Sequence, residues 1–150
     1  MYYDSEEIHV NGVRLVIITF RDTPRLRIGP QGTFDELLQL WIQCYERKQP
    51  FHFLFETRFM ENLPPITYCF KMALFIYNLK KRPFHYLKRS TILVKRTGIS
   101  RLLDIIFAIQ SPVAPVLVYR VQETLSNHHS LATCNLQHLV LTKDMKVINP

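Results

Sequence analysis

The sequence has little glycine and no long uncharged run of apolar residues. Only four of the 150 residues are glycine and 47% are hydrophobic, a composition that excludes collagen-like and disordered chains. No window of about 18 residues is both uncharged and predominantly apolar, so no transmembrane segment is expected. A chain of this length is expected to form one domain, with or without a short extension.

Cysteine is also scarce, and its spacing excludes a disulfide framework. The three cysteines, Cys44, Cys69 and Cys134, are an odd number and widely separated, and none belongs to a Cys-x-x-Cys pair. Cys44 and Cys69 fall inside apolar helical patterns, where a thiol usually packs as a small hydrophobe. The segment 1–7 is acidic and lacks the apolar core of a signal peptide. We therefore expect a cytoplasmic protein kept in a reducing compartment.

Signatures of nucleophilic catalysis and of nucleotide binding are missing. The chain contains no Gly-x-Ser-x-Gly elbow, no His-Glu-x-x-His motif and no glycine-rich phosphate loop. Glu56, late in a predicted strand, is a candidate general base, and Arg58 beside it favours an ion pair instead. We expect no catalytic residues and no cofactor.

Acidic residues are absent from one long window of the chain. The net charge is +7, from 19 Lys and Arg against 12 Asp and Glu, and no acidic residue lies between Glu61 and Asp104. This excess favours anionic partners such as nucleic acid or lipid headgroups, although basic residues also collect on solvated faces and at helix C-termini. In an α/β sheet the C-terminal ends of the helices and of the parallel strands lie at opposite rims, so these basic residues would be divided between two rims. The candidate anion-binding residues are Lys80, Lys81, Arg82, Lys88, Arg89, Lys95, Arg96 and Arg101.

A histidine-rich stretch near the C-terminus offers metal ligands. His128, His129, Cys134 and His138 combine imidazole and thiolate groups, which suit zinc. The stretch lacks the paired Cys-x-x-Cys spacing of structural zinc sites, and histidines in a polar segment are often simply exposed. The sequence is compatible with both interpretations.

Hydrophobic periodicity predicts alternating strands and helices. Asn11-Gly12 separates two apolar runs and predicts a type I′ hairpin turn. The helix at 66–81 is apolar on most sides, which favours burial against a sheet, and we expect Phe55 and Leu74 in the core. The predicted strands are 8–10, 13–20, 51–58, 90–96 and 114–121, the predicted helices are 34–47, 66–81 and 99–110, with a further helical turn over 86–89 and a terminal strand pair within 139–148.

This order of elements predicts an α/β domain. Strands that alternate with helices are typical of parallel crossovers. Over residues 1–121 we expect a mostly parallel central sheet with an N-terminal β-hairpin and three main helices. A C-terminal extension, 122–150, is expected to pack on this domain or to be partly mobile.

The order and lengths of the elements over residues 8–121 resemble the STAS fold of bacterial anti-sigma-factor antagonists and of the cytosolic tails of anion transporters. In the antagonists, a loop after the third strand carries a phosphorylatable Ser or Thr before a helix. The matching stretch, 56–67, lacks an Asp-Ser-Ser-Gly-like signature, and Pro64-Pro65 stand about where the serine would. The resemblance implies a non-enzymatic regulatory module that binds a protein partner, or a second copy of itself. The partner would dock through a sheet edge, a helix face or the loop in this stretch, and the partner-docking residues of the loop are Met60, Asn62, Pro64, Pro65 and Thr67.

A second resemblance covers Leu87–Arg96 and Ile109–Leu117. A strand, a helix and a proline-bounded return strand in this arrangement are similar to the late part of CRAL-TRIO (Sec14-like) lipid-binding domains. This resemblance implies an alternative function, the binding of anionic lipid headgroups through the basic region 80–101. Nucleic acid is the other anionic partner that this region allows.

Overall fold

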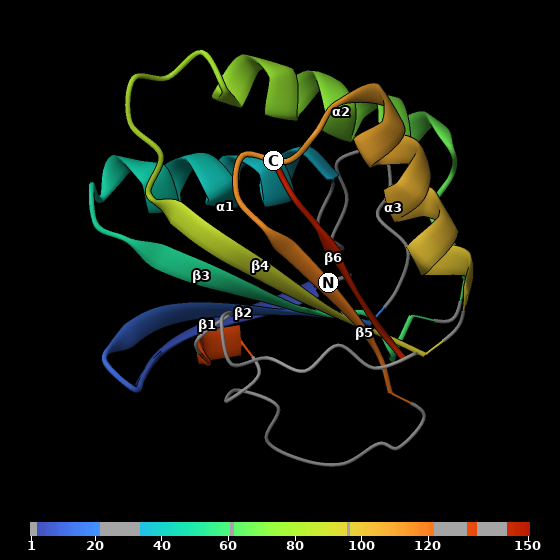
Figure 1. Ribbon diagram of the computed structural model, residues 1–150, viewed down its shortest axis with the longest axis horizontal. Helices are drawn as coiled ribbons and strands as arrows, with labels where there is room; N and C mark the ends of the chain where they lie inside the picture. The colour runs from blue at the N-terminus through green and yellow to red at the C-terminus, as the bar shows by residue number, and fades with distance from the viewer. Residues whose placement is uncertain (1–2, 22–33, 61, 96, 122–131, 135–143) are drawn as a thin grey trace.

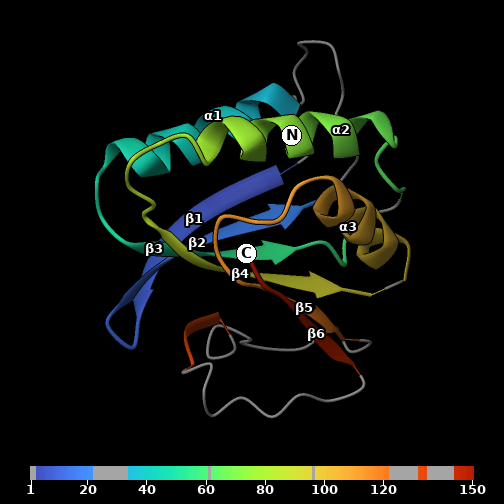
Figure 2. The same cartoon turned by 45° about the horizontal axis from the view of Figure 1, so that its top comes forward.

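The computed structural model describes residues 3–21, 34–60, 62–95, 97–121, 132–134 and 144–150. Its strands are β1 (Tyr3–Val10), β2 (Val13–Phe20), β3 (Phe51–Glu56), β4 (Leu87–Val94), β5 (Val116–Arg120) and β6 (Met145–Ile148), and its helices are α1 (Phe34–Glu46), α2 (Thr67–Leu79) and α3 (Thr97–Ile109). Within the described residues, the six strands form one sheet in chain order, and the three helices lie on one of its faces (Figures 1 and 2). The chain is therefore an α/β protein with three helices, as the sequence predicts.

Parallel pairing is confined to the four inner strands. β2, β3, β4 and β5 each run parallel to the next strand in the chain. β1 is antiparallel to β2, and β6 is antiparallel to β5. The sheet is therefore mixed and not the mostly parallel sheet that the sequence predicts, because both edge strands run against their neighbours. Each crossover between parallel strands leads to the next strand in the same direction along the sheet. Because these crossovers share one hand, their helices lie on the same face of the sheet.

The first hairpin follows from its turn residues. Asn11 and Gly12 both have positive φ, 52° and 75°, which is the backbone of a type I′ turn. The predicted hairpin is therefore confirmed. β1 is longer than expected and begins at Tyr3, which pairs with Phe20.

Alternate strand residues supply two cores, one on each face of the sheet. The larger core faces the helices and contains Phe51, Phe53 and Phe55, whose rings contact one another in sequence. Trp41 of α1 meets Phe53 edge-on, with ring centroids 4.8 Å apart. The smaller core on the opposite face consists of Leu15, Ile17, Leu54, Leu93 and Ala132.

Two expectations from periodicity are wrong. Residues 86–89 were expected to form a helical turn, but β4 already begins at Leu87, because this segment pairs with β3. Leu74 was expected in the core, but it is 61% exposed on the outer side of α2. Phe55, by contrast, is buried as expected.

The described residues of the C-terminal segment pack on the sheet. β6 extends it beyond β5, and Ala132 is fully buried against the face opposite the helices. Among the helices that the structure describes, none is both long and apolar enough to cross a bilayer.

Candidate functional site

An exposed apolar stripe runs along α2. Ile66, Phe70, Leu74 and Tyr77 recur at intervals of four, four and three residues, a spacing that places side chains on one side of a helix. Each of the four is more than half exposed. Leu63 before the helix and Phe84 after it are also large, apolar and more than half exposed. We call the four residues of the stripe the α2 face.

The opposite side of α2 is held in the core by both neighbouring helices. The Tyr68 ring stacks on Phe34 of α1, with centroids 4.8 Å apart. The Cys69 thiol lies 3.7 Å from the Leu102 carbonyl oxygen of α3, and Ile76 packs in the same cluster as α3. These contacts fix the rotation of α2 about its axis, and so they determine which residues face outward.

The charges beside the α2 face are distributed unevenly along the helix. Near its middle, the Lys71 ammonium pairs with Asp35 of α1 at 3.1 Å. At its C-terminal end, the Lys81 ammonium lies 4.5 Å from the centre of the Tyr77 ring, and Lys80 donates to Ser111 Oγ at 2.6 Å. Arg82 follows directly and is exposed. One end of the face is therefore cationic.

The candidate anion-binding residues fall at two opposite rims of the sheet. Lys80, Lys81 and Arg82 follow α2, and Lys88 lies at the start of β4, all near the N-terminal ends of the parallel strands. At the other rim, Lys95 follows the C-terminal end of β4 and Arg101 lies near the start of α3; both are exposed. Arg96 lies outside the described residues.

Arg89, in contrast to its basic neighbours, is buried on the face opposite the helices. Its Nε donates to the Ala132 carbonyl at 3.1 Å, and its Nη1 donates to the Cys134 carbonyl at 2.7 Å. Burial lowers the pKa of Arg89 below its ordinary value. The guanidinium thus ties the segment 132–134 to the sheet.

Three residues of the expected docking loop line a cavity of about 170 Å³ between the helices and the sheet: Met60, Pro64 and Pro65. Pro65 is exposed, and Met60 and Pro64 are half-buried, so this loop forms the rim of the cavity. Asn62 and Thr67 are exposed beside the rim and do not line it.

The cavity wall is apolar except for a few polar atoms. The lining comes from β2, β3, β4 and β5 on one side and from all three helices on the other, and no lining residue is charged. Trp41 lines the cavity and is 7% exposed. Among the described residues, its buried Nε1 has no hydrogen-bond partner.

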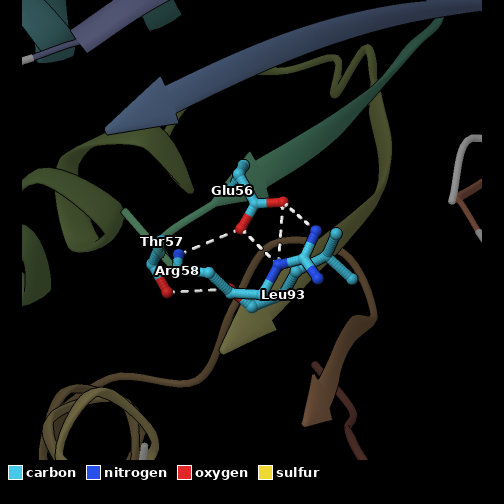
Figure 3. Close-up of polar contacts among 4 residues, drawn as sticks. All are labelled: Glu56, Thr57, Arg58 and Leu93. Atoms are coloured by element: carbon cyan, nitrogen blue, oxygen red, sulfur yellow. Dashed lines mark hydrogen bonds and ion pairs between the residues drawn. The ribbon is translucent and has the colours of Figure 1, made fainter. Parts of the chain in front are cut away.

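Glu56 is held in a compact ion pair at the C-terminal end of β3 (Figure 3). Arg58 donates to it from Nε at 2.9 Å, from Nη2 at 2.6 Å and from its backbone N–H at 2.9 Å. Thr57 between them donates its hydroxyl to the Leu93 carbonyl at 2.7 Å. These hydrogen bonds raise the pKa of Arg58 above its ordinary value. The expected ion pair is thus present, and it occupies both carboxylate oxygens that a general base would use.

Of the four candidate zinc ligands, one lies in the described part of the chain. His128, His129 and His138 lie outside them. Cys134 is described, and its carbonyl oxygen accepts the hydrogen bond from Arg89. In the described part of the chain, no group of three or more His, Cys, Asp or Glu residues is arranged to hold a metal ion.

Sequence reasoning missed both the α2 face and the cavity. Lys71 and Asn78 share a side of α2 with Leu74, and that polar spacing was an available signal of exposure. The cavity left no signal in the sequence, because it depends on how three helices settle on the sheet.

Two features of the described residues are thus candidates for a function: the α2 face, with its cationic end, and the cavity on the inner side of α2. Both are identified from the geometry of this chain itself. No family model, no curated protein and no solved structure matches the chain.

Proposed function

We propose that the chain is a non-enzymatic interaction module of STAS-like type that docks a protein partner on the α2 face. The observation that carries this proposal is a row of four large apolar side chains, each more than half exposed, on a helix whose other side is fixed in the core. Single exposed hydrophobic residues are ordinary, but a contiguous group marks an interaction surface. The STAS-like assignment rests on the resemblance in element order over β1 to β5, β-β-α-β-α-β-α-β, which β6 then extends.

The charges favour an acidic amphipathic helix as the part of the partner that docks. Apolar side chains of such a helix would pack on Phe70, Leu74 and Tyr77. Carboxylates at one of its ends would meet Lys81 and Arg82, which are exposed and have no acidic residue near them in the chain. Complementary charge of this kind fixes the orientation of docking and raises the association rate.

Other occupants fit less well. The carboxylate that a second copy carries beside its α2 face, Asp35, is already paired with Lys71. An anionic membrane would favour cations along the whole helix, whereas Lys71 is already neutralised by Asp35. Nucleic acid would favour one continuous basic surface, whereas the basic residues divide between two rims.

We place this module in the cytoplasm. Cys44 and Cys69 are both buried, and burial raises the pKa of each thiol. Such thiols are inert structural groups rather than disulfide partners, which suits a reducing compartment.

The test is binding to a purified partner by variants of the full chain. The partner is captured from a cell extract, identified, purified and titrated calorimetrically. Phe70→Ser/Leu74→Ser should weaken binding about 30-fold or more, as expected when central apolar contacts are lost. Lys81→Glu/Arg82→Glu should weaken it and reverse its salt dependence, because salt then screens a repulsion instead of an attraction. Ile109→Ser, an exposed residue of α3, is the matched control and should bind as the parent does.

Two other results would contradict this function. One is flotation with phosphatidylserine vesicles that Phe70→Ser/Leu74→Ser abolishes, without a protein partner. The other is a concentration-dependent dimer that the same variant dissociates. Either result would assign the α2 face to a different occupant.

A further inference from the structure

The cavity between the helices and the sheet has the size of a binding site for a small molecule. Its volume is about 170 Å³. An engineered apolar cavity of about 150 Å³ is large enough to bind benzene. Well-packed interiors contain few voids larger than a water molecule, so a half-open space of this size beside the core needs an explanation.

The lining restricts the charge of a ligand. It consists of aromatic, aliphatic, proline, methionine and cysteine side chains together with Thr57 and Ser90, and none of the lining residues is charged. A charged group placed there would lose its hydration with no counter-charge to compensate. The occupant is therefore uncharged and mostly apolar.

Trp41 adds one polar requirement. It is more than nine-tenths buried, it lines the cavity, and its Nε1 has no partner among the described residues. A buried indole N–H usually finds an acceptor, because leaving it unpaired costs about 1–3 kcal/mol. The hydroxyl groups of Thr57 and Ser90, which also line the cavity, do not accept a hydrogen bond from Trp41 Nε1.

We infer that Trp41 Nε1 borders this cavity, and that the cavity binds a small uncharged molecule, about the size of a six-membered ring or a short acyl chain, with one oxygen that accepts a hydrogen bond from Nε1. The molecule enters past Met60, Pro64 and Pro65, the rim residues. The site is independent of the proposed docking function, because it uses the inner side of α2 and the α2 face lies on the outer side.

The chain contains one tryptophan, so tryptophan fluorescence reports on this cavity directly. Cyclohexanone, which carries an acceptor oxygen, and cyclohexane, which carries none, are titrated into the full chain. Both should change the Trp41 fluorescence saturably. Only cyclohexanone should move the indole N–H proton resonance downfield, the signature of a new hydrogen bond.

Variants locate the binding. Ala114→Leu and Ser90→Ile each enlarge a buried lining residue and should weaken binding of both probes about tenfold or more. Two such variants are used because one of them can fail to fold. Trp41→Phe should weaken cyclohexanone binding about 2- to 10-fold, the value of one hydrogen bond, as followed by ligand-observed resonance. Leu74→Ser, on the α2 face, is the control and should bind both probes as the parent does.

Three results would overturn the inference. They are no saturable response to either probe, an undiminished response in both filled variants, and an indole N–H resonance that cyclohexanone leaves in place. Loss of binding in Leu74→Ser would mean that the probes report on the α2 face instead. Failure of partner docking would leave all of these measurements unaffected.

Discussion

His52 and Arg89 are cross-strand neighbours on β3 and β4, and both bind the same carbonyl oxygen. His52 Nδ1 lies 2.9 Å from the oxygen of Ala132, and Arg89 Nε lies 3.1 Å from it. Because a carbonyl only accepts, Nδ1 of His52 carries the hydrogen of this bond. The two side chains thus hold the segment 132–134 against the face of the sheet that the helices leave open.

Acid should weaken the fold through His52. Burial lowers the pKa of His52 below its usual 6.5, and the neighbouring Arg89 charge lowers it further. The unfolded chain therefore takes up the proton first, and the free energy of unfolding falls as the pH drops from 6.5 through the lower folded-state value. Urea unfolding across this range should show a smaller decline in His52→Gln than in the parent. Identical pH profiles for the two proteins would contradict the assignment.

Loss of the Arg89 side chain should destabilise the whole domain. Arg89→Met removes the charge-assisted hydrogen bonds to the Ala132 and Cys134 carbonyls and leaves the half-buried Cys134 carbonyl without this donor, so we expect a loss of about 2–3 kcal/mol. Lys88→Met is the matched control on the same strand. Lys88 is exposed, so its loss should change the free energy of unfolding by no more than about 0.5 kcal/mol. Equal effects in urea melts would show that Arg89 is not a buried tether.

The Glu56–Arg58 pair should behave as a coupled unit. The two side chains are 11% and 8% exposed, so removing one partner leaves a charge that is poorly hydrated. Glu56→Gln and Arg58→Met should each cost about 3 kcal/mol. The double variant should cost less than the sum by about 1 kcal/mol or more, because neither orphan charge remains. Strict additivity in a double-mutant cycle would show that the pair contributes no coupling.

Local chemistry predicted the parts of the fold that depend on neighbouring residues. Asn11-Gly12 specifies its own turn, and the apolar runs of β2 and β3 identify two inner strands without further information. The polar strand β1 was predicted too short, because Asp4 and Glu6 are exposed at the sheet edge and their strand conformation comes from pairing with β2. The start of β4 was predicted too late because Arg89 is charged. A charged residue enters a buried strand only when it finds hydrogen-bond partners, and those of Arg89 are carbonyl groups far away in the chain.

The candidate sites were less accessible to sequence reasoning. The division of the basic residues between two rims follows from the order of elements alone, and it was predicted. The α2 face was not: Lys71 and Asn78 mark its polar side, but the apolar residues on the other sides of the helix leave open which of them are buried. That choice is made by Phe34, Leu102 and other residues far away in the chain.

Two residues of α2 therefore offer the sharpest check on its orientation. Leu74 is 61% exposed and Ile76 is 3% exposed, although both are apolar residues of similar volume on one helix. Ile76→Ala should cost about 2–4 kcal/mol through lost burial and the cavity left behind. Leu74→Ala should cost no more than about 0.5 kcal/mol, since it removes few contacts and alanine favours the helix. Urea unfolding of the two variants decides the matter: if Leu74→Ala costs as much as Ile76→Ala, α2 buries the side that the docking proposal needs exposed, and that proposal fails.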